Sequence, residues 1–394
     1  MRLVNATLPD GTRRNIDIEG GRISALPPVS AGGSNAARPG DLDLGGALLL
    51  PPLIDGHIHL DKTLLGLAWV PNESGPTVAD RIATEKRVRA KRTVSEEETG
   101  ANLVRQVMAS GTLHMRCHVD IDSQLGLKNL HAILKLRESF RDLVTIQIVA
   151  FPQSGVLRSP GTADLLDAAI AEGADLVGGL DPMGIDGDLD GHLGAIFGIA
   201  EKRGVGLDIH LHDGGEAGIA QQVAIAERAV AHGLSGRVAI SHAFALGSVP
   251  IELATRTADT LAKAGVAIMS HGPGAAPMPP VKMLREHGVE VFGGSDNIRD
   301  AWSPFGNGDM LERATIIGYR ANFRRDEELE IAFDMVTAAA ARVLGIAPYG
   351  IALGAPADFV VVEAGSVAEA VATRPRRKLV IKAGRVIARD GVLV

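Results

Sequence analysis

Apolar and polar residues alternate along the chain in a way that separates a long middle from two different ends. In the middle, apolar runs of strand length are separated by longer, Ala-rich amphipathic stretches such as residues 164–172, 215–232 and 251–264. Repeated alternation of strand and helix is typical of a (β/α)8 barrel, with the strands buried on both faces. The eight runs are 53–60, 112–121, 144–151, 174–180, 205–211, 238–243, 266–270 and 289–293.

Both ends of the chain lack helical periodicity. They consist of short apolar runs separated by turn residues, which predicts strands joined by tight turns. We therefore expect an α/β protein: a barrel over residues 51–344 and a small composite β-sandwich domain over 1–50 plus 345–394. The predicted strands are 2–7, 15–18, 22–25, 358–363, 379–381 and 386–388, with a loop rich in Pro, Ala, Gly and Ser over 27–40.

An open doubly wound sheet is the main alternative for the middle of the chain. Such sheets usually have fewer strand–helix units, and a Gly-rich phosphate loop commonly follows the first strand. The segment after residues 53–60 has no such loop, so the pattern favours the barrel.

Composition narrows the class of protein. Hydrophobic residues make up 46% of the chain but aromatic residues only 3%, so small aliphatic side chains must fill the core. The net charge of -7 comes without long runs of one sign, which argues against nucleic acid as a partner. With one cysteine, Cys117, no intramolecular disulfide can form. No signal-peptide pattern or membrane-length apolar run is visible, so we expect a cytoplasmic protein without a membrane partner. The oligomeric state is open, a homo-oligomer included.

The positions of the 12 histidines are the most informative feature of the sequence. Four fall on predicted helices, where a packing or surface role is common: His131, His192, His232 and His287. The other eight fall in or at the ends of predicted strands: His57, His59, His114, His118, His210, His212, His242 and His271. Buried imidazoles without partners cost ~1–3 kcal/mol each, so eight of them indicate a ligand at the barrel mouth, where active sites of this fold lie.

His57 and His59 are two residues apart on the first predicted barrel strand. Side chains alternate along a strand, so both imidazoles point to the same side. On the fifth strand Asp208, His210 and His212 share a face in the same way, and one of the two histidines can supply a third imidazole. This arrangement predicts a metal site built from at least two strands.

Two further residues belong to the candidate site, and Asp296 is the one that completes the set of metal ligands. His242 ends the sixth strand, and Asp296 follows the eighth, where the strand opens into its loop. Three imidazoles and one carboxylate suit Zn²⁺ or Fe²⁺, and such an ion lowers the pKa of a bound water. Asp296 can then be both ligand and proton acceptor; capping a helix is the alternative role for it.

With these residues in place, the chain resembles the amidohydrolase superfamily and, within it, the bacterial cytosine deaminases. The resemblance covers nearly the whole chain in the same order. The motifs that carry it are LPPLIDGHIHLDK at 50–62, GTLHMRCHVD at 111–120, QIVAFPQ at 147–153, DIH at 208–210, SH at 241–242, Asp296 with WSPFG at 302–306, and ADFVVV at 357–362.

The resemblance implies a role for each matching residue. His242 would polarise the attacking water, and Asp213 would protonate the ring nitrogen and pass a proton to the leaving amine. Gln153 would bond the carbonyl edge of the substrate, and Trp302 would wall the pocket, with Asn297 beside it. The implied ligands of one Zn²⁺ or Fe²⁺ ion are His57, His59, His210 and Asp296.

Two departures from the family pattern bear on the substrate. Cytosine deaminases carry Glu where this chain has Asp213, and a second Asp where it has Asn297. A shorter acid and an uncharged amide, which can donate a hydrogen bond, indicate a ring larger than cytosine or differently decorated. Binuclear members also need a lysine on the fourth strand. The run 174–182 has none, which predicts a single metal ion.

The leading hypothesis is therefore a metal-dependent hydrolytic deaminase of a nitrogen heterocycle, a small-molecule substrate, with release of ammonia. The same metal centre can also open the ring of a cyclic amide or imide, because the two reactions differ only in which C–N bond breaks. A barrel that binds a ligand without turnover is the third reading. Ammonia release, ring-opened product, or neither would distinguish the three.

Overall fold

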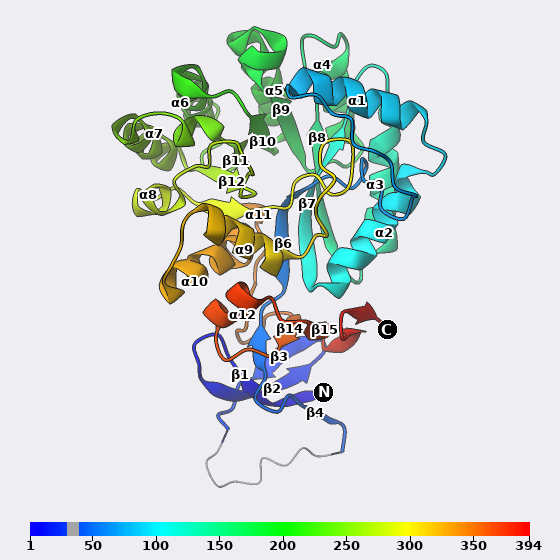
Figure 1. Ribbon diagram of the computed structural model, residues 1–394, viewed down its shortest axis with the longest axis vertical. Coiled ribbons are helices and arrows are strands. Elements are labelled where there is room, and N and C mark those ends of the chain that lie inside the picture. Colours follow the sequence, from blue (N-terminus) through cyan, green and yellow to red (C-terminus); the bar gives the residue numbers. More distant parts are fainter. Residues whose placement is uncertain (30–38) are drawn as a thin grey trace.

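A computed structural model describes residues 1–29 and 39–394 of the chain. Most of the loop predicted over 27–40 thus lies outside the described residues. The described chain forms a barrel of parallel strands with helices around it and a second sheet below the barrel (Figure 1). Both chain ends lie with the lower sheet, so the barrel is a long insertion between its two halves.

The barrel contains eight parallel strands whose order in space follows the sequence. Every residue of its second strand is buried, as expected for a strand covered by helices on one side and by the barrel interior on the other. The (β/α)8 barrel predicted from the sequence is confirmed. Its strands are β6 (Leu53–Ile58), β7 (Thr112–Asp120), β8 (Thr145–Phe151), β9 (Leu176–Leu180), β10 (Gly206–Leu211), β11 (Val238–His242), β12 (Val266–Ser270) and β13 (Val291–Gly293).

Most of the helices follow the barrel strands and cover their outer side, whereas the last helix lies between two strands of the second sheet in the sequence (Figure 1). Their ends carry the expected signals: Ser95 caps the second helix, and Thr77 forms a capping box with Asp80 at the first. The helices are α1 (Val78–Ala90), α2 (Glu96–Ala109), α3 (Lys128–Ser139), α4 (Thr162–Ala171), α5 (Leu189–Arg203), α6 (Gly215–Ala231), α7 (Ile251–Ala264), α8 (Val281–Glu286), α9 (Met310–Arg320), α10 (Asp326–Met335), α11 (Ala338–Leu344) and α12 (Val367–Thr373).

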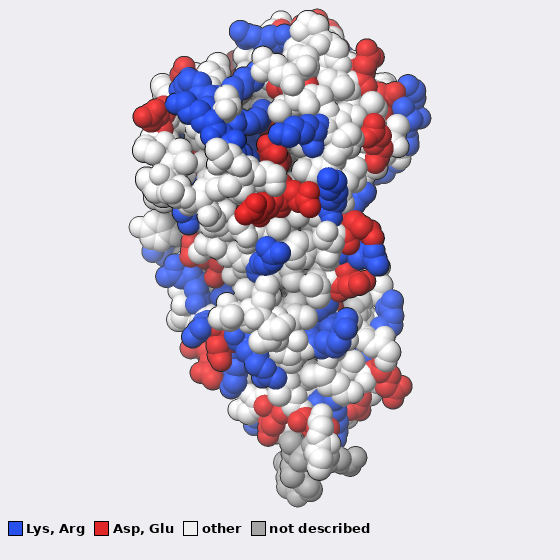
Figure 2. Space-filling view, turned by 90° about the vertical axis from the view of Figure 1, so that its right-hand side faces the viewer, with Lys and Arg blue, Asp and Glu red and all other residues white. Residues whose placement is uncertain are grey.

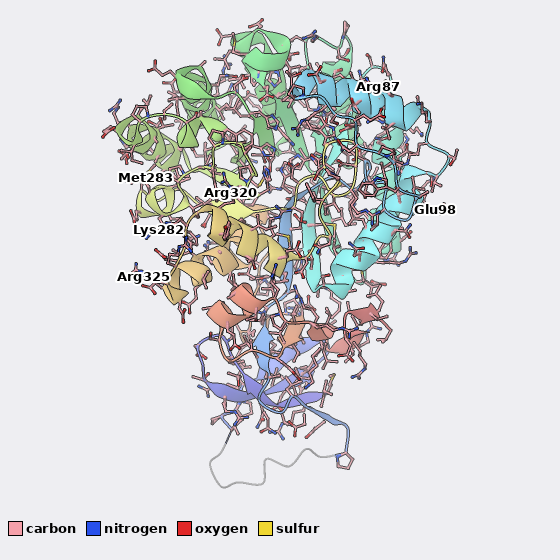
Figure 3. The ribbon with its side chains drawn as sticks, viewed as in Figure 1. Arg87, Glu98, Lys282, Met283, Arg320 and Arg325 are labelled. Carbon is pink, nitrogen blue, oxygen red and sulfur yellow. The ribbon has the colours of Figure 1, made fainter. Side chains whose placement is uncertain are left out.

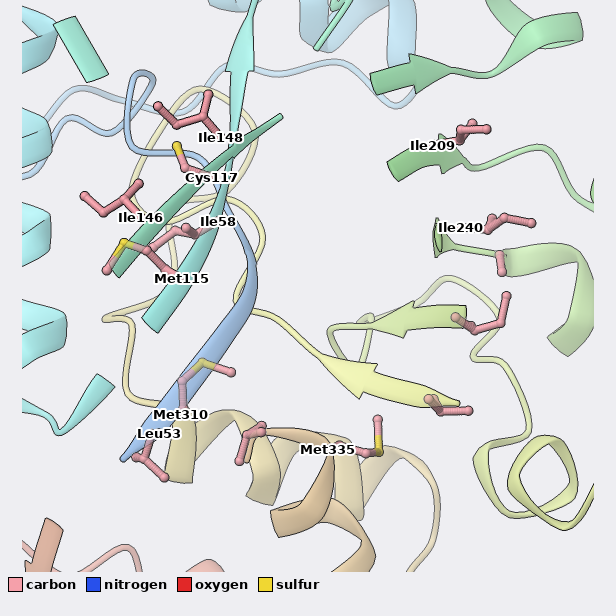
Figure 4. Close-up of a cluster of buried hydrophobic side chains, with 14 of the residues drawn as sticks. Leu53, Ile58, Met115, Cys117, Ile146, Ile148, Ile209, Ile240, Met310 and Met335 are labelled. Carbon is pink, nitrogen blue, oxygen red and sulfur yellow. The ribbon is translucent and has the colours of Figure 1, made fainter. Parts of the chain in front are cut away.

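The main core lies between the strands and the helices. Ile58, Met115, Cys117 and Ile148 from three neighbouring strands belong to one buried cluster, shown in Figure 4. Met310 of α9 belongs to the same cluster. The cysteine is thus a free, buried core residue.

The barrel closes between its first and last strands. The backbone N–H of Asp296 donates to the carbonyl of His57 over 2.7 Å, and Ser295 N–H donates to the Asp55 carboxylate over 2.8 Å. The two segments approach so closely that a Cβ at Gly294 would lie 2.5 Å from that of His57. This seam brings the Asp296 side chain beside the histidines of β6.

The second sheet has nine strands and draws on both ends of the chain, as the sequence predicts. Its order is β17-β16-β15-β14-β5-β1-β2-β3, with β4 paired to β1. The domain limits at residues 50/51 and 344/345 stay a prediction. The strands are β1 (Arg2–Thr7), β2 (Arg13–Glu19), β3 (Arg22–Ala25), β4 (Asp41–Asp43), β5 (Leu48–Leu50), β14 (Phe359–Val362), β15 (Arg377–Lys382), β16 (Arg385–Arg389) and β17 (Val392–Leu393).

Acidic and basic side chains both occur along the length of the face shown in Figure 2. Arg87 of α1 and Glu98 of α2 lie at the periphery of the barrel, as Figure 3 shows. Among the described residues, no helix is both long and apolar enough to span a bilayer.

Candidate active site

Four side chains converge at the mouth of the barrel. One ligand atom from each of His57, His59, His210 and Asp296 lies within 4.8 Å of the others. The Asp296 Oδ1 atom is 3.5 Å from His57 Nε2 and 3.4 Å from His59 Nε2. Asp296 has a φ of 62°, which is unusual for a residue with a side chain and marks the sharp turn after β13.

Hydrogen bonds behind the cluster fix the tautomer of His57. The Ser241 hydroxyl donates to the Asp208 carboxylate over 2.6 Å, so its oxygen accepts from His57 Nδ1 at 2.9 Å. Arg116 donates to the other oxygen of Asp208 at 2.8 Å. With its proton on Nδ1, His57 directs the lone pair of Nε2 into the site.

His59 is oriented in a similar way. Its Nδ1 donates to the backbone carbonyl of His118 over 3.1 Å, which leaves the Nε2 lone pair free. Burial lowers the pKa of His59, and it lowers that of His210 well below the usual value, so both rings are neutral. Burial raises the pKa of Asp296, but His242, His57 and His59 outweigh it and hold that pKa well below its usual range.

The donor set fits a divalent cation. His57 Nε2 and both ring nitrogens of His210 are buried without a hydrogen-bond partner. Each such atom costs about 1–3 kcal/mol unless something binds it. Neutral imidazoles beside one carboxylate are the donor types that Zn²⁺ and Fe²⁺ take.

A cavity of about 510 Å³ opens above this cluster. Seven of the residues to which the resemblance assigns a role line it: His59, His210, His242, Asp296, Gln153, Asn297 and Trp302. His57 lies beneath it with no exposed surface. Asp213 is not among the lining residues, and its carboxylate accepts from Gly184 N–H at 3.0 Å and from Gln221 Nε2 at 2.9 Å.

His212 lines the cavity where Asp213 does not. The Asp181 carboxylate accepts from its Nδ1 at 2.8 Å and from its backbone N–H at 2.6 Å. Burial alone would lower the pKa of His212, but Asp181 outweighs burial and raises it. Asp181 therefore favours the protonated form of the His212 imidazole at the cavity wall. The centroid of this ring is 4.5 Å from that of His242.

His242 has its Nδ1 3.2 Å from Nδ1 of His271, while its Nε2 is buried without a partner. Its φ of 75° is another unusual backbone angle at this mouth. The ring lies beside the four-residue cluster, 5.1 Å from the ring of His210. His242 is thus positioned to hold a molecule at the cavity floor through Nε2.

The opposite wall contains residues that the sequence analysis did not assign. The Lys62 ammonium donates to Gln153 Oε1 and pairs with Asp120 at 2.8 Å. Trp302 Nε1 donates to Glu85 of α1 at 2.6 Å. Lys62 follows the HxH motif by three residues, and that proximity is the only signal that singles it out.

The remaining strand histidines have other surroundings. His118 is buried and stacked on His57 with 3.8 Å between the ring centroids. His114 lies near Tyr349 and outside the cavity, and burial lowers its pKa to about 4. On α5, His192 is fully buried and paired with Asp186 at 2.7 Å, a structural role away from the mouth.

Comparison with known proteins identifies similar chains over the whole length. The model of a family described as "Amidohydrolase family" matches residues 42–388. The N-isopropylammelide isopropyl amidohydrolase of Pseudomonas sp. (strain ADP) is 34% identical over 360 residues, which are 90% of this chain and 89% of that protein.

Solved structures agree. The N-isopropylammelide isopropylaminohydrolase of Burkholderia multivorans is 44% identical, with a TM-score of 0.94 and coverage of 100% of this chain and 99% of the other. The 5-methylcytosine deaminase of Klebsiella pneumoniae, solved with 5-fluorocytosine, is 27% identical with a TM-score of 0.88, covering 99% and 97%.

Proposed function

The chain belongs to the amidohydrolase family, and from that premise we propose that it removes an alkylamino or amino group from an oxo-substituted triazine or pyrimidine ring by hydrolysis. The observation that carries the proposal is the convergence of His57, His59, His210 and Asp296 under a cavity lined by polar, ring-binding side chains. The 44% identity to a protein that acts on N-isopropylammelide favours a substituted triazine over cytosine.

The overall reaction is a substitution at a ring carbon. The oxygen of water bonds to that carbon, the exocyclic C–N bond breaks with its electrons going to nitrogen, and the nitrogen leaves with a proton as an amine. A divalent ion bound by the four residues supplies Lewis acidity and lowers the pKa of water. All other steps fall to side chains of the chain itself.

Two histidines would handle the protons. His242 Nε2, buried and without a partner, would accept a hydrogen bond from the attacking water. His212, whose protonated form is favoured by Asp181, would donate a proton to the leaving nitrogen or to its neighbour in the ring. Asp296, beside the site of attack, is the proposed acceptor for one proton of water, which would pass to whichever of the two nitrogens His212 does not protonate. The other proton of water would restore His212, so the amine and the ring nitrogen together gain the two protons that water loses.

The far wall would bind the ring. Lys62 can only donate, so it turns Gln153 Oε1 towards itself and leaves the buried Nε2 without a partner. That nitrogen would donate to a ring carbonyl. Trp302, fixed through Glu85, would cover one face of the ring.

The test is an assay of the metal-loaded protein with N-isopropylammelide and 5-methylcytosine. We expect isopropylamine from the first compound at a higher kcat/KM than ammonia from the second. A ring-opened product would replace the proposal with a cyclic amidase, and no product from any oxo-triazine or pyrimidine would favour a binding protein.

We expect one tightly bound divalent ion per chain, because the described residues provide one set of three imidazoles and a carboxylate. Elemental analysis after dialysis measures the stoichiometry, and His57→Ala should lower it to near zero. His114→Ala is the matched control, since it removes another buried strand histidine away from the cavity. Two stably bound ions in the wild type would contradict the assignment.

Asp213→Asn should leave kcat within about threefold of the wild type. Asn can still accept from Gly184 N–H, and the side chain lies outside the cavity, where substitutions typically change free energies by ~0.5 kcal/mol. The earlier expectation of a proton shuttle at this position predicts a loss of about 10²–10⁴-fold instead. Steady-state kinetics on the best substrate distinguish these outcomes.

A further inference from the structure

Asp300 is a buried carboxylate in the loop after β13, and neither the sequence motifs nor the proposed chemistry uses it. It is 4% exposed. Its Oδ1 accepts from the backbone N–H groups of Trp302 at 2.8 Å and Ser303 at 3.0 Å. Its Oδ2 accepts from Asn297 Nδ2 at 2.7 Å. One carboxylate thus connects two residues that line the cavity.

The charge of Asp300 decides which end of the Asn297 amide faces it. Burial raises the pKa of Asp300 to about 6 against the hydrogen bonds of Asn297, Ser303 and Trp302, so the group is mainly ionised at neutral pH and above. An ionised carboxylate only accepts, so the amide nitrogen must turn towards it. The oxygen of Asn297 is then the atom left for a molecule in the cavity.

From this geometry we propose that Asp300 is a specificity-determining positioning residue: it fixes Asn297 as a hydrogen-bond acceptor, so the cavity selects rings that carry an N–H group at that point. The inference rests on the proposed function, because it concerns the ring bound at the same site. From the sequence, Asn297 is expected to donate a hydrogen bond to the substrate; here Asn297 would accept one instead.

The amide of Gln153 is oriented in the same way as that of Asn297, but by a cation instead of an anion. The cation Lys62 occupies the oxygen of Gln153 and leaves its nitrogen as a donor, whereas the anion Asp300 occupies the nitrogen of Asn297 and leaves its oxygen as an acceptor. A ring with both a carbonyl and an N–H group can accept a hydrogen bond from Gln153 and donate one to Asn297. A ring whose nitrogens are all alkylated leaves the acceptor unpaired, at a cost of ~1–3 kcal/mol or about 5- to 150-fold in affinity.

The test is calorimetric binding of two rings to the metal-loaded protein: cyanuric acid, which has ring N–H groups, and its N,N′,N″-trimethyl derivative, which has none. We expect the wild type to bind cyanuric acid at least about tenfold more tightly. In Asp300→Asn the Asn297 amide can turn over, and the ratio of the two affinities should fall to a few-fold. Because both proteins meet the same added methyl groups, the change in the ratio reports the hydrogen bond rather than bulk.

A double variant separates positioning from a merely structural role. In Asn297→Asp with Asp300→Asn, the amide at 300 donates to the new carboxylate, whose second oxygen is again an acceptor in the cavity. We expect the ratio to return towards that of the wild type, while Asn297→Asp alone, with two adjoining carboxylates, should bind both rings poorly. Asp122→Asn is the matched control: this carboxylate also accepts from two backbone N–H groups, at 2.8 and 2.9 Å, outside the cavity.

Metal content is measured for every variant, because Asn297 adjoins Asp296. An unchanged ratio in Asp300→Asn, an equal loss of affinity for both rings, or a double variant that fails to restore the ratio would each overturn the inference, as would a wild type that does not bind cyanuric acid. Amine release from N-isopropylammelide is scored separately. If it fails while the ratio behaves as expected, the proposed reaction is wrong and the role of Asp300 stands.

Discussion

His212→Gln is expected to lower kcat by about 10²–10⁴-fold, the usual effect of removing a positioned acid. The imidazole lines the cavity and Asp181 raises its pKa, whereas glutamine keeps a hydrogen bond to Asp181 but has no acidic proton. We expect KM and metal content to change much less than kcat. Steady-state kinetics with elemental analysis measure all three.

The control for this variant is His232→Gln. His232 is also paired with a carboxylate, that of Glu201 at 2.8 Å, but it lies at the end of α6 and away from the cavity. Its substitution should leave kcat unchanged. A His212→Gln protein with wild-type kcat would remove His212 from the proton path and return attention to Asp213.

His242→Ala is expected to reduce turnover to the background of the assay while most of the metal stays bound. The four proposed ligands do not include His242, and its free Nε2 faces the place where water must lie. The loss therefore falls on kcat, by about 10²–10⁴-fold or more.

The competing assignment makes His242 a ligand, since its ring can group with His271 and Asp296 around an ion. Metal content decides between them: a His242→Ala protein that loses its ion as His57→Ala does would make His242 a ligand. His271→Ala helps to separate the roles, because loss of the 3.2 Å contact should weaken the orientation of His242 and lower kcat only in part.

The fold was predictable because its signals are local. The apolar runs of the barrel strands, such as that of β7, and the turn-separated strands at both ends follow from patterns within a few residues. The helix α12 and the short strands β4, β5 and β17 went unpredicted, as each spans too few residues to show a clear period. The seam between β6 and β13 depends on contacts between distant segments.

In the candidate site, too, the features that follow from local sequence patterns were predictable, and those that depend on contacts between distant residues were not. The shared face of His57 and His59 follows from strand periodicity alone. The choice between His212 and Asp213 does not, because it depends on Asp181, which lies 31 residues from His212 in sequence and reaches it only in the folded barrel. Adjacent residues at the end of β10 thus point to different surroundings, one to the cavity and one to Gly184.

The seam of the barrel has a consequence for how relatives of this chain can diverge. Asp55 and Ser295 are 240 residues apart, yet they and their neighbours both close the barrel and carry the proposed ligands His57 and Asp296. A change there alters folding and chemistry together, so selection on either property constrains both. Residues 273–276 also line the cavity, but they are neither proposed metal ligands nor part of this seam. We therefore expect new substrate preferences to evolve through substitutions at residues 273–276, and the residues of the seam to vary less among relatives.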